Sequence, residues 1–252
     1  MLSNLDLTND QIDQFAADGY LVFRSAFSAS DMATIAQWTD EMLARPEVSG
    51  QHWVFHEDSR TNPGEKLVSR IERLTQFHDG FQVLAETLRR PVSQLLGKKA
   101  VLFKEKVNFK MPGGDGFKPH QDSQAGWDAY ADFFISALVS IDRATLENGC
   151  LQLAGGHHKS GMFKSWEPMT DADMAGMELV PVPTEPGDVV FFDSFAPHAS
   201  DPNNSDSIRR IYYATYNRAS AGDHMDTYYA DKHKNYPPDI DRDPNRNYVF
   251  RV

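Results

Sequence analysis

The chain has 252 residues, of which 40% are apolar and 24% charged, with 16 glycines and 14 prolines. This composition is typical of a soluble globular protein and excludes a disordered, collagen-like or low-complexity chain. The 36 acidic residues outnumber the 25 lysines and arginines, so the net charge of −11 argues against nucleic acid and anionic membrane surfaces as partners.

Two further features of the sequence predict a cellular location. Cys150 is the only cysteine, so no internal disulfide can form. The first residues contain neither the basic segment nor the apolar segment of a secretory signal, and no apolar run reaches the roughly 18–20 residues that span a bilayer. We therefore expect a cytoplasmic protein.

Residues 1–97 are predicted to be a mostly helical flanking region, because apolar residues recur there at helical spacing in three segments. The expected elements are a helix capped by Thr8, a strand over 20–23, a helix capped by Ser28 or Ser30 and stopped by Pro46, and a helix over about 81–96 whose Val83, Leu84, Leu88 and Leu95 face inward.

From residue 98 to 220 the pattern changes to short runs rich in Val, Ile, Phe and Tyr, separated by turn signals. No helical crossover lies between them, so we expect antiparallel pairing in a sandwich or jelly roll, with a mainly β fold and flanking α-helices. Residues 221–252 look like a polar C-terminal tail. Without repeats or linkers, one domain is expected to span 1–252. The predicted strands cover 101–110, 133–141, 151–153, 179–182, 189–192 and 211–216.

His120-Gln121-Asp122 is the first candidate site, because a His-x-Asp triplet can direct an imidazole and a carboxylate at one metal ion. A His followed two residues later by an Asp also occurs at His56 and His224, which we interpret as solvated histidines in a loop without a following strand and in the polar tail. His120 differs because it follows a predicted strand through a glycine turn.

His198 also follows a predicted strand, 189–192. Two histidines and one carboxylate on neighbouring strands occupy one face of an iron ion, as in the facial triad of non-haem Fe(II) oxygenases. A thiolate-bound structural zinc is not expected in a chain with one cysteine.

Arg209 lies eleven residues beyond His198, at the start of the last predicted strand. A guanidinium is always charged and binds a carboxylate through two N–H groups, which suits an acidic co-substrate that chelates iron with its other end. Ser200 is a candidate second donor to the same carboxylate.

Together these residues resemble the phytanoyl-CoA dioxygenase-like branch of the Fe(II)/2-oxoglutarate oxygenases. The resemblance implies a double-stranded β-helix, Fe(II) bound by His120, Asp122 and His198, and 2-oxoglutarate anchored by Arg209. It also implies that O₂ oxidises 2-oxoglutarate to succinate and CO₂ while a substrate C–H bond is hydroxylated. The motifs that carry it are Asp18-Gly19-Tyr20-Leu21-Val22, His120-Gln121-Asp122, Glu147-Asn148-Gly149-Cys150-Leu151, Gly156-His157, Pro186-Gly187-Asp188-Val189, His198 and Arg209.

Strand alternation places Lys104, Lys106 and Asn108 on one face of the predicted strand 101–110. Similarity to relatives such as ectoine hydroxylase implies that Lys104 and Asn108 lie beside 2-oxoglutarate and that Lys106 contacts the substrate. Ser123, next to the triad carboxylate, is expected to assist. The alternative is a solvated edge strand whose lysines prevent aggregation.

The stretch 104–114, together with 216–220 and 228–229, resembles the bacterial members that hydroxylate 2-aminoethylphosphonate. Lys106 suits a phosphonate, and Asp193, Trp127 or Tyr130 suits an ammonium group. We therefore expect a small polar substrate, with 2-aminoethylphosphonate or a similar zwitterion as the best candidate. The sequence does not predict the oligomeric state.

Two other interpretations stay open. The same iron chemistry can desaturate or cyclise a natural product. The chain can also be a non-catalytic jelly roll that binds a small acid or sugar, in which case it does not bind iron. Succinate formation that depends on Fe(II) and 2-oxoglutarate separates the second interpretation from the oxygenases.

Overall fold

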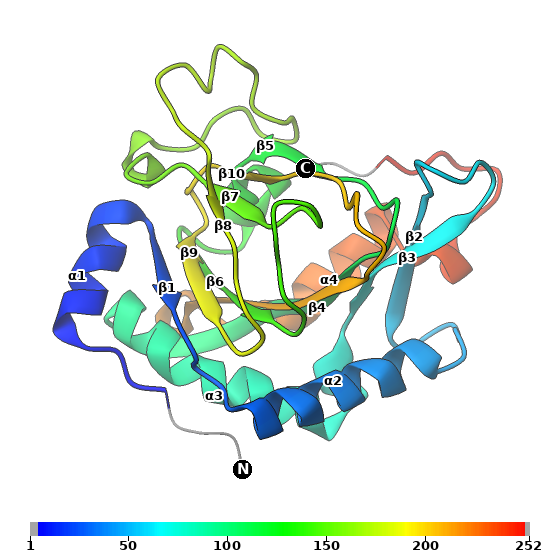
Figure 1. The fold of residues 1–252 in the computed structure, drawn as a ribbon, viewed down its shortest axis with the longest axis horizontal. Helices are drawn as coiled ribbons and strands as arrows, with labels where there is room; N and C mark the ends of the chain where they lie inside the picture. Colours follow the sequence, from blue (N-terminus) through cyan, green and yellow to red (C-terminus); the bar gives the residue numbers. More distant parts are fainter. Residues whose placement is uncertain (1–4, 250–252) are drawn as a thin grey trace.

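The computed structural model describes residues 5–249 and shows two antiparallel β-sheets with helices packed outside them (Figure 1). Seven strands form the larger sheet in the order β1-β9-β6-β11-β4-β3-β2, and four form the smaller one in the order β5-β10-β7-β8. This is the expected double-stranded β-helix. The ends of the predicted domain, residues 1–4 and 250–252, lie outside the described residues.

The six strands predicted between 101 and 216 are all present, with ends that shift by at most two residues. In the larger sheet the strands are β1 (Tyr20–Phe23), β2 (Trp53–Asp58), β3 (Lys66–Glu72), β4 (Ala100–Lys110), β6 (Phe134–Ser140), β9 (Val189–Asp193) and β11 (Arg209–Arg218). In the smaller sheet they are β5 (Phe117–His120), β7 (Leu151–Leu153), β8 (Val180–Val182) and β10 (His198–Ser200).

The helices are α1 (Asn9–Asp18), α2 (Ala29–Ala44), α3 (Asp79–Leu96) and α4 (Met225–Asn235). Thr8 and Ser28 cap α1 and α2, and each forms a reciprocal capping box. Helices α2 and α3 cover the outer face of the larger sheet (Figure 1).

One inward position on α3 was predicted wrongly. Leu84 and Leu88 are fully buried, but Val83 is 46% exposed. The buried positions of α3, spaced three or four residues apart, form a single stripe that faces the sheet, and Val83 lies outside that stripe.

The hairpin of β2 and β3 was not predicted. It extends the larger sheet, because Arg70 of β3 pairs with Asn108 of β4. His56 therefore lies on β2, with a strand following it, and its ring contacts Asp239 at 3.0 Å. Polar residues such as Glu57 and Ser69 interrupt the apolar alternation that would have identified these strands.

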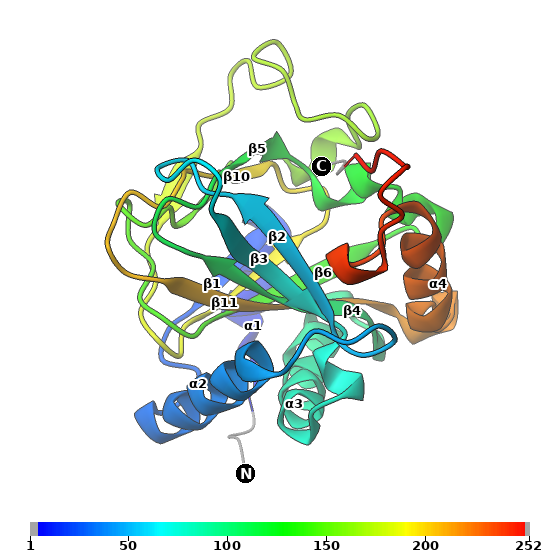
Figure 2. The ribbon, with the colours of Figure 1, turned by 90° about the vertical axis from the view of Figure 1, so that its right-hand side faces the viewer.

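The predicted C-terminal tail contains α4, which lies beside the hairpin of β2 and β3 (Figure 2). Tyr228 packs on Phe103 with ring centroids 4.7 Å apart, and Tyr229 packs edge-on against Trp53 at 5.1 Å. The helix is thus part of the core and not a solvated extension. None of the helices within residues 5–249 has the length and apolar character required to cross a bilayer.

Glu105 is a buried carboxyl group on the outer face of β4, on the side away from Lys104 and Lys106. One of its oxygens accepts hydrogen bonds from the Thr75 backbone N–H at 3.1 Å and the Thr75 hydroxyl at 3.2 Å. The other oxygen is buried without a hydrogen-bond partner among the described residues. Burial raises the pKa of Glu105 to about 8.

We predict that Glu105→Gln increases stability at alkaline pH. A glutamate in the unfolded chain titrates near pH 4.3, so the folded state holds the Glu105 proton more tightly. Its stabilising contribution is present at acidic pH and is lost as the pH rises through about 8. The free energy of unfolding of Glu105→Gln should exceed that of the wild type by about 1–3 kcal/mol at pH 8, and by less at pH 5.

Urea denaturation between pH 5 and pH 8 measures this difference, with the exposed Glu178→Gln as the control. A constant gap between Glu105→Gln and the wild type across that range would contradict the assignment.

Candidate active site

The three predicted metal ligands meet at one end of the smaller sheet. His120 ends β5, Asp122 follows it, and His198 begins β10 directly opposite His120 in the antiparallel pair. One ligand atom of each residue lies within 4.8 Å of the others, and the Nε2 of His198 is 4.0 Å from an Asp122 oxygen. Within residues 5–249, no other group of three His, Cys, Asp or Glu residues meets this criterion.

Hydrogen bonds orient each ligand toward the same point. The Nδ1 of His120 lies 2.7 Å from the Lys118 carbonyl oxygen, and the Nδ1 of His198 lies 3.0 Å from the Ala196 carbonyl oxygen. If each Nδ1 donates its proton to that carbonyl, both Nε2 atoms are available to a metal ion.

Ser136 and Thr215 orient Asp122 and were not predicted. The Ser136 hydroxyl donates to one Asp122 oxygen at 3.0 Å and is 2.9 Å from the Thr215 hydroxyl. The sequence signal was available, because each residue is a polar position flanked on both sides by apolar residues of its strand. Polar side chains buried in such strands need a specific partner.

The charge states of these residues suit a divalent metal. Burial, and then the neighbouring His198, lowers the pKa of His120 to about 3, so its imidazole is neutral. Burial opposes ionisation of Asp122, but the charges of His198 and Lys104 outweigh it and lower its pKa. A buried set of two imidazoles and one carboxylate, without thiolate, matches the non-haem iron facial triad.

The metal donors open into a cavity of about 520 Å³ between the two sheets, within the range of small-ligand pockets. Of the residues predicted to contact the co-substrate or the substrate, six line it: Lys104, Lys106, Asn108, Trp127, Tyr130 and Ser200. Asn108 also has a buried side-chain oxygen with no hydrogen-bond partner in the described part of the chain. That atom is available to a donor on a bound molecule.

Arg209 and Ser123 do not belong to the described lining of the cavity. Arg209 is 2% exposed, projects from the same face of β11 as Tyr213, and donates to the Gly149 carbonyl oxygen. Lys110, which was not predicted, lies next to it and donates to the Ser200 hydroxyl at 2.8 Å. The alternation that identified Lys104, Lys106 and Asn108 also reaches Lys110.

Asp193 lies outside the described lining of the cavity, which argues against the predicted contact with a substrate. Its carboxylate accepts a hydrogen bond from the Phe195 backbone N–H at 2.7 Å, and burial raises its pKa to about 6. The side chain therefore stabilises the turn before His198. The position of Asp193 near His198 in the sequence did not predict the direction in which its side chain points.

An acidic group that does line the cavity was missed. Glu72 of β3 accepts from the Lys232 ammonium through both oxygens, each at 2.6 Å, and from Arg70 Nε at 2.8 Å. Asp231, next to Lys232 on α4, also lines the cavity and accepts a hydrogen bond from the Tyr130 hydroxyl at 2.8 Å. These residues come from the two regions whose structure was not predicted.

The sequence profile described as Phytanoyl-CoA dioxygenase (PhyH) matches residues 15–211. The chain belongs to the phytanoyl-CoA dioxygenase family. A 2-aminoethylphosphonate dioxygenase from uncultured bacterium HF130_AEPn_1 is 35% identical to this chain. The alignment covers 96% of this chain and 93% of the relative. The methylphosphonate hydroxylase of Gimesia maris is 34% identical, over 92% of this chain and 89% of the relative.

Solved structures show the same fold for this phytanoyl-CoA dioxygenase family member. EctD from S. alaskensis with 2-oxoglutarate and 5-hydroxyectoine superposes with a TM-score of 0.75 at 23% identity, over 85% of this chain and 77% of that chain. The epimerase SnoN in complex with Fe³⁺, alpha ketoglutarate and nogalamycin RO superposes with a TM-score of 0.70 at 20% identity. The superposition covers 95% of this chain and 93% of that chain. The family and the His-Asp-His triad make this protein an Fe(II)/2-oxoglutarate-dependent dioxygenase.

We predict that Asp122→Ala removes metal binding while the fold stays intact. Asp122 is the only carboxylate of the triad. Its loss should weaken Fe(II) binding by more than roughly 100-fold, because loss of a residue that only hydrogen-bonds to a metal ligand already weakens metal binding by up to about 100-fold. Anaerobic Fe(II) titration and succinate formation measure the two effects. His56→Ala is the control, because His56 contacts Asp239 and Glu47 far from the triad. Equal losses in both variants would contradict the assigned ligand set.

Proposed function

We propose that this dioxygenase hydroxylates a C–H bond of a small phosphonate, with 2-aminoethylphosphonate as the leading candidate. The observation that carries the proposal is Lys104, which projects from β4 into the cavity that contains the metal donors, with its ammonium over the Trp127 ring. Two relatives, at 35% and 34% identity, are named as a 2-aminoethylphosphonate dioxygenase and a methylphosphonate hydroxylase.

His120, Asp122 and His198 would hold the iron, and Arg209 is the proposed anchor of 2-oxoglutarate. When bound, Fe(II) and 2-oxoglutarate would supply the electrons that activate O₂, so that one oxygen atom is inserted into a substrate C–H bond. Arg209 suits a carboxylate because its Nε is buried without a hydrogen-bond partner among residues 5–249. Ser200, Asn108 and Ser123 are proposed to complete the surroundings of the co-substrate.

The two lysines face different parts of the cavity. The ammonium of Lys104 is 4.2 Å from the centroid of the Trp127 ring, whereas that of Lys106 is 5.2 Å from the Tyr213 ring. Tyr213 lies on the same face of β11 as Arg209. We therefore propose the reverse of the sequence-based assignment, with Lys106 beside 2-oxoglutarate and Lys104 beside the substrate.

Charge supports an anionic substrate. Arg70, Lys104, Lys106, Lys232 and Arg246 line the cavity, against the three carboxylates Glu72, Asp122 and Asp231. Burial, followed by the charge of Lys104, lowers the pKa of Lys106 to about 7. Two neighbouring ammonium groups in this buried site therefore repel each other when no anion is bound. A phosphonate beside Lys104 relieves that repulsion.

Trp127 provides a second recognition element for the phosphonate. Its ring is 1% exposed and lines the cavity, and its indole N–H has no hydrogen-bond partner among the described residues. A buried N–H is costly when unpaired, and a phosphonate oxygen is a strong acceptor. Lys104 and Trp127 together therefore form the proposed phosphonate site.

A substrate screen tests the proposed function. The holoenzyme with Fe(II), 2-oxoglutarate and ascorbate should form succinate roughly tenfold faster when 2-aminoethylphosphonate or methylphosphonate is added, because substrate binding couples co-substrate turnover to hydroxylation. Ectoine and an acyl-CoA are the comparison compounds and should not stimulate turnover. Stimulation by ectoine or the acyl-CoA, with no response to either phosphonate, would contradict the proposal.

Paired lysine variants test the two assigned roles. Lys104→Ala should raise the KM for the phosphonate about 10–100-fold and leave the KM for 2-oxoglutarate within about twofold, because a charge-assisted contact is lost on the substrate side only. Lys106→Ala should show the opposite pattern. The exposed Lys98→Ala is the control for the loss of a positive charge. The reverse result in the two variants would restore the sequence-based assignment.

A further inference from the structure

The chain beyond β11 closes one side of the active-site cavity. The family profile matches only to residue 211, whereas the two phosphonate-named relatives align with 96% and 92% of this chain. The cavity-lining residues in this later segment are Tyr228, Asp231, Lys232, Asn235, Tyr236, Arg246, Asn247 and Val249. A segment that lies beyond the family profile and lines the cavity is well placed to select among substrates.

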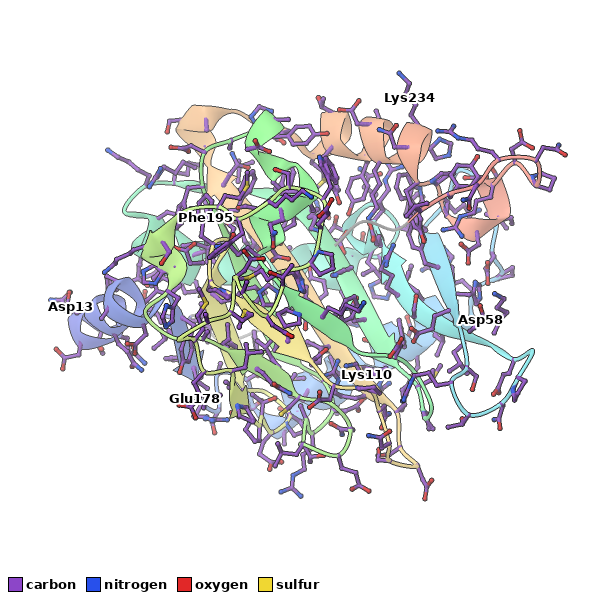
Figure 3. All side chains as sticks on the ribbon, turned by 90° about the horizontal axis from the view of Figure 1, so that it is seen from above. Asp13, Asp58, Lys110, Glu178, Phe195 and Lys234 are labelled. Carbon is purple, nitrogen blue, oxygen red and sulfur yellow. The ribbon has the colours of Figure 1, made fainter. Side chains whose placement is uncertain are left out.

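Two sets of contacts fix α4 against the larger sheet. Lys232 forms the buried ion pair with Glu72, whose side chain is 3% exposed. The Tyr229 hydroxyl donates to the Glu105 carbonyl oxygen at 3.0 Å. Lys234, two residues further along, points away from the barrel (Figure 3). These contacts therefore hold the face of α4 that carries Lys232 toward the cavity. Asp231 is the residue directly before Lys232 in the sequence.

Asp231 is the cavity-lining carboxylate whose charge is not already used. Glu72 is paired with Lys232 and Arg70, and Asp122 belongs to the metal site. Asp231 accepts a hydrogen bond from the neutral Tyr130 hydroxyl and forms no ion pair with any residue in the part of the chain that the structure describes. Asp231 is exposed at the edge of the cavity, where its carboxylate is available to a cation on a bound molecule.

Aromatic rings connect the proposed phosphonate site with Asp231. Lys104 lies 5.6 Å from the Tyr228 ring as well as 4.2 Å from the Trp127 ring. Tyr228 packs edge-on against Tyr130 at 5.9 Å, and Tyr130 bonds to Asp231. The cavity thus presents a cation at one end of this row of rings and an anion at the other. A zwitterion with an anionic head and a cationic tail matches that order.

We propose that Asp231, oriented by Tyr130 and held in place by the Lys232–Glu72 pair, receives the ammonium group of the substrate and makes the enzyme prefer an aminoalkylphosphonate over an alkylphosphonate. This inference rests on the proposed function. It names the residue that separates two classes of phosphonate and assigns the C-terminal segment a role in selectivity.

The test compares two isosteric ligands. In n-propylphosphonate a methyl group replaces the ammonium group of 2-aminoethylphosphonate, so the two differ mainly in the charge at the tail. Binding of each to the anaerobic holoenzyme with Fe(II) and 2-oxoglutarate is measured by calorimetry. Asp231→Asn should weaken 2-aminoethylphosphonate binding about three- to tenfold and change n-propylphosphonate binding by less than about twofold, because one charge-assisted contact at an exposed carboxylate is removed.

Asp226→Asn is the matched control, because Asp226 lies on the same helix and borders a separate surface depression outside the active-site cavity. It should change neither affinity. Equal weakening of both ligands by Asp231→Asn, or no change in either, would overturn the role of Asp231 and leave the proposed function standing. Failure of the wild type to bind 2-aminoethylphosphonate would overturn both.

Discussion

The antiparallel pairing of β5 with β10 is the interaction on which the active site depends, because it places His198 opposite His120. Both strands are short, with four and three residues, so they need support from their neighbours. Gln121 supplies part of it. Its amide donates to the Phe195 carbonyl oxygen at 2.7 Å and to the Gly161 carbonyl oxygen at 2.9 Å. Gln121, which lies between the ligands His120 and Asp122, thus connects their loop to the segment that precedes His198.

The two sheets divide the chemistry of the site. The smaller sheet and its loops carry the metal ligands, whereas the larger sheet supplies the basic side chains and, through Ser136, the hydrogen bond that orients Asp122. An acidic chain therefore concentrates positive charge in its interior. Buried cations without counter-ions cost free energy, so bound anions stabilise the folded protein as well as enable catalysis.

The sequence predicted the parts of the fold and site that follow from short-range patterns. Alternation identified β4 and its lysines, and the two histidines were singled out because each follows a predicted strand, although β5 and β10 themselves were not predicted. It could not locate Glu72 or Asp231, because β3 and α4 are rich in polar residues and pack through long-range contacts. The direction of the Asp193 side chain could not be predicted for a related reason. Sequence position placed it near His198, but only the turn geometry shows that its carboxylate binds the Phe195 backbone N–H.

Anomalous diffraction at the iron edge, from crystals grown anaerobically with Fe(II) and 2-oxoglutarate, is the most direct measurement of the central claim. It should show one iron per chain, bound by the Nε2 atoms of His120 and His198 and by one Asp122 oxygen, with the distal carboxylate of 2-oxoglutarate on Arg209. Iron bound at other residues, or no iron between β5 and β10, would contradict the account.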